Sequence, residues 1–212
     1  MEIDVAGVGG ADQEHLMNSL VVPRPIAWVG TQGADGVRNL APFSYFTLVS
    51  STPPVVLVSF SPSGRKDSLD NITETGEFVV NVVADPLRHP MVASSAELDH
   101  AIDEMDLLGL GTAPSVSITP PRLAAAPAAL ECVLHQVIPV YGSTAVLGRV
   151  LHVHVADEVM RDGRVVAELL APVARLGGSL YTTVSSSYRI DRPRTDDPEL
   201  VRAAAHAPGS SS

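Results

Sequence analysis

The stretch PPVVLVSFSPSGRKDSLDNITETGEFVVNVV, residues 53–83, carries the clearest structural signal in the chain. Its two ends, 53–60 and 77–83, are almost entirely apolar and rich in valine, which is typical of β-strands buried on both faces. The polar segment between them has the length of two helical turns and is followed by Gly76, a residue common just after a helix. The stretch therefore predicts a strand, a short helix at about 68–75 and a second strand.

The rest of the chain is also expected to be mainly β, with a few short helices. Short runs rich in valine and isoleucine are bounded by turn signals, and Asp35-Gly36 and Asp162-Gly163 suit hairpin turns. Between 85 and 110 the pattern becomes mixed and helical. The further strands that we expect are 25–31, 115–121, 130–142 and 144–160, of which the last two could close a barrel.

Length and composition favour one globular domain. A chain of 212 residues with 45% hydrophobic content can bury a full core. Its formal net charge of −10 argues against nucleic acid or an anionic membrane as the main partner. We expect a single domain over 1–190. The segment 191–212 is rich in proline, charge and finally serine, so we expect a tail that is poorly ordered or lies over a partner subunit.

The cysteine content and the N-terminus indicate the cytoplasm. A single cysteine, Cys132, excludes an intramolecular disulfide and a cysteine-rich metal site, and its apolar neighbours favour a buried strand position. The first residues, MEIDVAGVGG, are acidic where a signal peptide needs positive charge. No apolar run approaches the roughly 20 residues of a membrane span.

Common nucleotide, metal and hydrolase motifs are missing from the sequence. There is no G-x-x-x-x-G-K-[ST], and GVGGAD (7–12) lacks the third glycine and the preceding strand of a dinucleotide site. Strand alternation places His152 and His154 on one face, but zinc would need a third ligand, so we interpret them as barrel or interface residues. The sequence therefore predicts no metal site and identifies no catalytic residue.

The loop before the expected helix has the parts of a phosphate site. Ser63, Gly64, Arg65 and Lys66 precede a helix start, where the first backbone N–H groups lack helical acceptors. Hydroxyl groups, a small residue and two cations would complete such a site. On this stretch alone, the two cations are equally consistent with solvated surface charges.

A second segment, RNLAPFSYFTLVSSTPP (38–54), is short of charge and rich in aromatic residues. Three aromatic residues, Phe43, Tyr45 and Phe46, fall within the four positions 43–46, although only 4% of the whole chain is aromatic. These rings could plug the core or form a flat wall against a planar ligand. Such a wall, with amide and hydroxyl groups close by, would suit a phosphorylated aromatic cofactor.

The combination of these motifs resembles the flavin reductase-like family, whose members bind FMN on a split β-barrel. The resemblance includes N-L-A-P-F-S-Y-F, K-D-S and E-F-V-V-N-V-V at matching spacings, and it spans roughly residues 20–185. It implies a mainly β fold, a split β-barrel of the Greek-key type with a few short helices. The matching segments are 24–46, 53–83, 115–132 and 171–181.

The resemblance also implies which residues bind the cofactor. Arg65, Lys66, Asp67 and Ser68 would hold the phosphate, and the remainder would line the ring and the ribityl chain. The segment beginning at Arg175 also matches, and the resemblance implies a role for it as a lid or a subunit contact. The full expected set is Thr31, Asn39, Leu40, Ala41, Ser44, Phe46, Ser59, Phe60, Ser61, Arg65, Lys66, Asp67 and Ser68.

The activity implied by the resemblance is hydride transfer from NADH or NADPH to FMN, with FAD as an alternative flavin. The flavin would perform the chemistry, and the protein would supply positioning and electrostatics. The resemblance further implies a homodimer and a partner oxygenase that receives reduced flavin. Two alternatives stay open: an FMN-bound electron carrier or substrate-specific flavoprotein, and a non-catalytic flavin-binding or assembly module.

Overall fold

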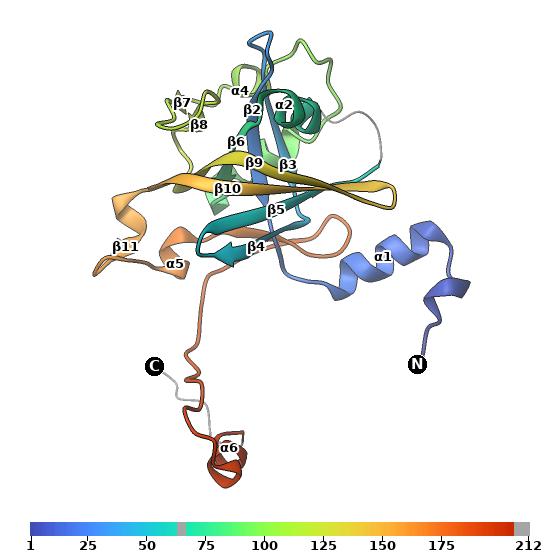
Figure 1. The fold of residues 1–212 in the computed structure, drawn as a ribbon, viewed down its shortest axis with the longest axis vertical. Helices are drawn as coiled ribbons and strands as arrows, with labels where there is room; N and C mark the ends of the chain where they lie inside the picture. Colours follow the sequence, from blue (N-terminus) through green and yellow to red (C-terminus); the bar gives the residue numbers. More distant parts are fainter. Residues whose placement is uncertain (63–66, 206–212) are drawn as a thin grey trace.

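The computed structural model describes residues 1–62 and 67–205, and its main feature is a curved seven-stranded antiparallel sheet (Figure 1). The strand order is β3-β2-β6-β9-β10-β5-β4, so strands distant in sequence are neighbours. The strands are β2 (Ala27–Gln32), β3 (Arg38–Phe43), β4 (Phe46–Ser51), β5 (Pro54–Phe60), β6 (Glu77–Val82), β9 (Ala128–Val140) and β10 (Ser143–Val155). The mainly β prediction is confirmed.

Shorter elements surround this sheet. One small sheet has the order β1-β13-β14, and two strand pairs, β7-β8 and β11-β12, complete the β-structure of the described residues. The short strands are β1 (Arg24–Pro25), β7 (Thr112–Ala113), β8 (Arg122–Leu123), β11 (Met160–Arg161), β12 (Arg164–Val165), β13 (Val173–Arg175) and β14 (Tyr181–Thr183). The α-helices are α1 (Gly10–Leu20), α2 (Asp67–Thr75), α3 (Arg88–Ala93), α4 (Glu104–Leu107), α5 (Ala167–Leu170) and α6 (Pro198–Ala204). The short 3-10 helices are η1 (Val5–Gly7), η2 (Asp85–Leu87) and η3 (Asp157–Val159).

The core lies on both faces of the central strands. Along β2, Val29 packs into one apolar cluster and Trp28 into a second cluster that includes Met91 of α3 and Met105 of α4. The ring of Phe78 lies against Gly148, so a Cβ at that position would overlap the ring. The strands of the site therefore rest on a rigid, doubly buried support.

The helix that the sequence predicts is present. Helix α2 spans Asp67–Thr75 and ends at Gly76, whose φ of +76° is the left-handed conformation that favours glycine. Gly36, in the turn before β3, likewise has a φ of +88°. Cys132 is fully buried in β9, as expected.

The prediction of a strand at 115–121 is wrong. This segment forms bends between β7 and β8. Its backbone N–H groups donate to carboxylates instead of a neighbouring strand: Val116 and Ser117 to Glu131, at 2.8 and 2.6 Å, and Thr119 to Glu77, at 2.8 Å. The β-branched residues of the segment favoured a strand, but these side-chain acceptors replace the ladder.

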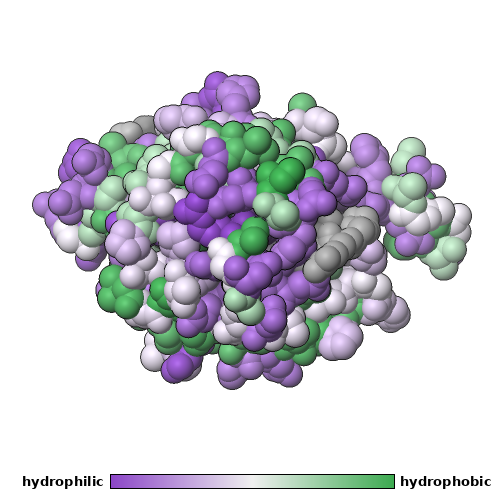
Figure 2. Space-filling model, turned by 90° about the horizontal axis from the view of Figure 1, so that it is seen from above, coloured by the Kyte–Doolittle hydropathy of each residue, from purple (hydrophilic) through white to green (hydrophobic). Residues whose placement is uncertain are grey.

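The two ends of the chain lie outside the barrel. Helix α1 buries none of its residues, and the C-terminal segment leaves the barrel and ends in α6 at a distance from it (Figure 1). Seen from above, the end of the molecule that carries α2 and α4 is covered largely by hydrophilic side chains (Figure 2). Among the described helices, none combines the length and the hydropathy needed to cross a membrane.

Candidate functional site

Two adjoining cavities lie beside the C-terminal half of β3. Cavity A has a volume of about 420 Å³ and lies between β3, the start of α2 and the segment 94–104. Cavity B has a volume of about 520 Å³ and lies between β3, α1 and the β13–β14 connection. Both are lined by Pro42, Phe43 and Ser61, so they form one cleft with two ends.

The start of α2 is held against β3 at cavity A by buried hydrogen bonds. Asn39 Nδ2 donates to Ser68 Oγ at 2.7 Å, and both side chains are buried. One turn further along, Asn71 Nδ2 donates to Thr31 Oγ1 at 3.0 Å. The first N–H groups of α2 have no acceptor within the helix, so this fixed helix start can offer them to an anion.

The opposite wall of cavity A carries His100 and Glu104. His100 bridges two carboxylates, with Nδ1 3.0 Å from Asp67 Oδ1 and Nε2 3.3 Å from Asp35 Oδ2. Glu104 accepts a hydrogen bond from the Leu40 N–H at 2.9 Å, and burial raises the pKa of its carboxyl group. These contacts join the 94–104 segment to both α2 and β3, which fixes the width of the cavity.

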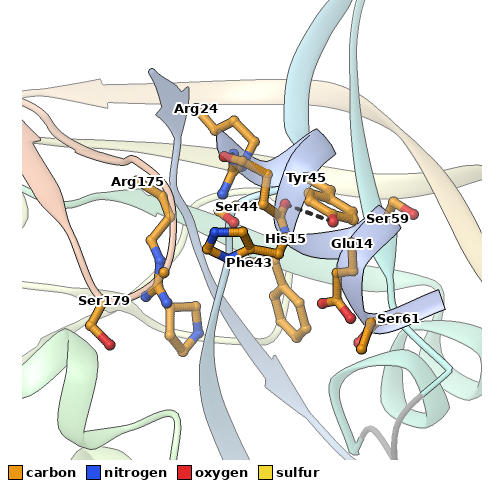
Figure 3. A pocket seen from close by; sticks show the side chains of 14 residues that line it. Glu14, His15, Arg24, Phe43, Ser44, Tyr45, Ser59, Ser61, Arg175 and Ser179 are labelled. Carbon is orange, nitrogen blue, oxygen red and sulfur yellow. Dashed lines mark hydrogen bonds between the residues drawn. The ribbon is translucent and has the colours of Figure 1, made fainter. Parts of the chain in front are cut away.

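Cavity B is lined by residues from several separate parts of the chain (Figure 3). Helix α1 contributes Glu14, His15 and Asn18, and the Tyr45 hydroxyl donates to Asn18 Oδ1 at 2.8 Å. Arg24 on β1 and the end of β13 complete the wall. The cavity floor includes Phe43, whose ring centroid lies 4.5 Å from that of Phe60 in the core.

The structure brings many of the sequence-predicted residues together. Asn39, Ala41, Ser61, Asp67 and Ser68 line cavity A, and Ser44, Ser59 and Ser61 line cavity B. The side chains of Thr31, Leu40 and Phe60 are fully buried behind these walls, and Phe46 lines a third cavity nearby. Arg65 and Lys66 lie outside the described residues.

Some lining residues were not identified from the sequence. The 94–104 segment, with His100 and Glu104, showed only a mixed helical pattern, and nothing local indicated that it faces α2. The α1 residues and Arg24 were missed because they lie far from the other lining residues in sequence. Arg175 was singled out as a lid or subunit contact, and it lies in the wall of cavity B.

In the described parts of the chain, no group of three or more His, Cys, Asp or Glu residues is arranged to bind a metal. His154 Nε2 lies 2.5 Å from Glu131 Oε1, and its ring centroid is 4.8 Å from that of His152. The two histidines therefore share one face of β10, as alternation predicted, and His154 contacts the buried carboxyl group of Glu131.

Known structures resemble the whole chain. Nitrilotriacetate monooxygenase component B from Bacillus cereus is 32% identical with a TM-score of 0.85, over 89% of this chain and 98% of that protein. The 2-nitrobenzoate 2-nitroreductase NbaA of Pseudomonas fluorescens is 30% identical with a TM-score of 0.84, over 92% and 97%. A protein with a split barrel domain from Shewanella frigidimarina is 22% identical with a TM-score of 0.81, over 91% and 100%, which confirms the predicted split β-barrel fold.

The family resemblance seen in the sequence motifs is confirmed. The model of the flavin reductase like domain matches residues 17–170, which contain all of β2 to β12 and therefore both walls of cavity A. The chain belongs to the flavin reductase like domain family.

Proposed function

We propose that this protein binds FMN in the cleft formed by cavities A and B and transfers hydride to it from NADH or NADPH. It would act as an NAD(P)H:FMN oxidoreductase in the cytoplasm. The observation that carries the proposal is the continuity of the cleft, from the start of α2 in cavity A to the aromatic and hydroxyl wall of cavity B. FAD would require further room beyond the phosphate end.

The residues present fit FMN. Each cavity falls within the roughly 300–1,000 Å³ typical of ligand sites. Asn39 and Ser68 already hold the helix start in place at one end, where an anionic phosphate would meet its N–H groups. Lys66, the only lysine of the chain, and Arg65 are adjacent in sequence to this helix start, which supports their proposed role at the phosphate.

When bound, FMN would supply a ring that accepts hydride at N5. The part left to the protein is to bind and orient the ring and to exclude water. Phe43, fixed by its contact with Phe60, offers an apolar surface, while Ser44, Ser59 and Ser61 offer hydroxyl groups along the cleft. No side chain here is assigned as an acid or a base, because hydride transfer between the two cofactors needs neither.

We also propose that the protein is a homodimer that delivers reduced flavin to a partner oxygenase. An exposed apolar surface on β4, including Leu48 and Val49, adjoins an apolar cavity of about 570 Å³ lined by Phe46 and Leu57, which supports a subunit contact. The similarity to a monooxygenase component supports the oxygenase partner. We treat 1–190 as the flavin-binding domain and 191–212 as a C-terminal tail, of which 206–212 lie outside the described residues.

The test is flavin binding followed by turnover. The purified protein should quench FMN fluorescence and oxidise NADH or NADPH in the presence of excess free FMN. The variant Lys66→Ala should weaken FMN much more than riboflavin, because a charged hydrogen bond to phosphate contributes roughly 1.5–3 kcal/mol. Absence of FMN binding by the wild type would refute the proposal, and equal weakening of both flavins would remove Lys66 from the phosphate.

A substrate-specific flavoprotein is the second candidate, favoured by the similarity to a nitroreductase. Such a protein would keep FMN bound and would not release reduced flavin. Steady-state turnover separates the two, since a reductase accelerates with free FMN and a protein with resident FMN does not. Bound flavin without any NAD(P)H oxidation would instead identify a non-catalytic module or an electron carrier reduced by another protein.

A further inference from the structure

Two arginines face each other in the wall of cavity B. Arg24 on β1 and Arg175 on β13 are directly paired across the two antiparallel strands, and both line the cavity. Like charges directly opposite each other on neighbouring strands repel. The arrangement therefore needs a compensating negative charge, or strong screening by water.

Screening by water is restricted at this pair. Arg24 is only 8% exposed, and its Nε is buried with no hydrogen-bond partner among the residues that the structure describes. A second pair of opposed arginines, Arg161 and Arg164, lies on the β11–β12 hairpin, but both of those side chains are exposed and water can screen them. The burial of Arg24 is what distinguishes the pair in cavity B, where Arg175 is half-buried.

The contacts of the two arginines leave their charge uncompensated. Arg24 donates to the carbonyl oxygens of Asn18, Val21 and Leu176, and Arg175 donates to the Tyr181 hydroxyl and lies over its ring. These partners are all neutral. They fix the position of each guanidinium group but supply no full negative charge.

The acidic residues near the cavity do not supply that charge either. Glu14 is the one carboxylate among the lining residues of cavity B, and it forms no ion pair with either arginine within the described residues. In Figure 3, Arg175 and Ser179 lie on one side of the cavity and Glu14, Ser59 and Ser61 on the other. His15 projects between the two sides. The side with the arginines is therefore cationic, although the net charge of the chain is −10.

We propose that Arg24 and Arg175 form an oxyanion site that binds a carboxylate or phosphate group of the molecule that reacts with the flavin. The site lies in the same cleft as the proposed flavin wall, which is where a second reactant must enter. Arg175 is the more accessible of the two and would make the direct contact, while Arg24 adds charge behind it and holds α1 against the cavity. The proposal rests on the proposed function, because it names the chemical class of that second reactant.

The experiment titrates FMN-saturated protein with simple anions by calorimetry. Inorganic pyrophosphate represents a phosphate source, benzoate represents a carboxylate source, and benzamide is the neutral control. Arg175→Gln should lower the affinity for whichever anion the wild type binds by about tenfold or more, as expected for the loss of a charged hydrogen bond. The matched control Arg164→Gln, which removes one charge from the exposed arginine pair, should leave binding unchanged.

The arms identify the source of the oxyanion. If Arg175→Gln loses affinity only for pyrophosphate, the site binds the phosphates of a nicotinamide dinucleotide. If it loses affinity only for benzoate, the site binds a carboxylate on the electron acceptor. Arg175→Lys should restore part of the affinity, because charge is retained, which separates anion binding from the structural contact with Tyr181. Turnover with NADH should also fall more in Arg175→Gln than turnover with the uncharged donor N-benzyl dihydronicotinamide.

Three results would overturn the proposal: no anion binds to the wild type, Arg175→Gln binds anions as well as the wild type does, or benzamide is affected equally. Failure of the proposed function is seen separately, as failure to bind FMN. In that case the same titrations are made on flavin-free protein, where the comparison of Arg175→Gln with Arg164→Gln still decides whether the oxyanion site exists.

Discussion

Replacing Glu131 by glutamine should destabilise the fold in a way that depends on pH. Glu131 lies on β9 and is fully buried. Its carboxylate accepts hydrogen bonds from the N–H groups of Val116 and Ser117, at 2.8 and 2.6 Å, and its Oε1 lies 2.5 Å from His154 Nε2. Glu131→Gln keeps the shape of the side chain, removes its charge and turns one acceptor into a donor.

The magnitude follows from these three contacts. In the variant, one of the two backbone N–H groups faces an amide NH₂ in place of an oxygen and loses its partner. A hydrogen bond to a charged group contributes roughly 1.5–3 kcal/mol, and a buried unsatisfied donor costs about 1–3 kcal/mol. Because the variant no longer buries a charged group, a lower desolvation cost offsets part of this loss. We expect the free energy of unfolding to fall by about 2–4 kcal/mol at neutral pH.

The pH dependence has a definite sign. Burial raises the pKa of Glu131, but the hydrogen bonds from His154, Val116 and Ser117 outweigh it and hold the pKa below its usual range. A carboxyl group with a lowered folded-state pKa stabilises the fold above its unfolded pKa, about 4.3, and this contribution is lost as pH falls through the folded-state value. The difference between wild type and variant should therefore shrink in acid.

Urea unfolding followed by circular dichroism at several pH values measures this difference. The exposed residue Glu74 offers a matched control, because Glu74→Gln removes the same charge from a side chain that is open to water. The control should stay within about 0.5 kcal/mol of wild type. The reasoning is refuted if Glu131→Gln also stays within that margin at neutral pH, or if its deficit is the same at every pH.

Three further predictions concern the core and the site. Gly148→Ala should lower the free energy of unfolding by roughly 1–3 kcal/mol in urea denaturation, because the added methyl overlaps a buried aromatic ring. Gly111→Ala, with open space around it, is the control, and equal effects would contradict the overlap. Ser68→Ala removes the acceptor of Asn39 and should weaken FMN more than riboflavin in fluorescence titrations; an equal change would place Ser68 away from the phosphate. Burial raises the pKa of the Cys132 thiol to about 12, so native protein should resist iodoacetamide at mildly alkaline pH, whereas rapid labelling would contradict that burial.

Elements set by short-range chemistry were predictable from the sequence. The helix α2 follows from its length, its polar pattern and Gly76, all of which are local. The strands β5 and β6 follow from uninterrupted valine-rich runs. Ser61, Asp67 and Ser68 of cavity A lie on or beside these elements, within recognisable motifs, and could therefore be predicted as cofactor-binding residues.

Features that depend on distant partners could not be predicted in this way. The segment 115–121 has strand-like residues, but its N–H groups donate to the carboxylates of Glu131 and Glu77. No local sequence pattern predicts that these carboxylates will replace a neighbouring strand as acceptors. Helix α1 lacks the amphipathic pattern that would mark a packed helix, and in the structure it buries no residue. The pairing of Arg24 with Arg175 in cavity B could not be predicted either, because the two arginines are 151 positions apart in the sequence.

In the proposed arrangement, the wall that would hold the flavin and the wall that would meet its reaction partner are built from different parts of the chain, and Arg24 bonds only within the second. The wall proposed to face the flavin belongs to strands whose other face is core, so changes there would endanger folding. The opposite wall is α1 and the β13–β14 connection, joined to each other by one guanidinium group through Asn18 and Leu176. Because α1 has no fully buried residue, most of its positions can change without disturbing the core. In a barrel built this way, the wall that would meet the second reactant can be altered without disturbing the strands that carry the stability of the fold.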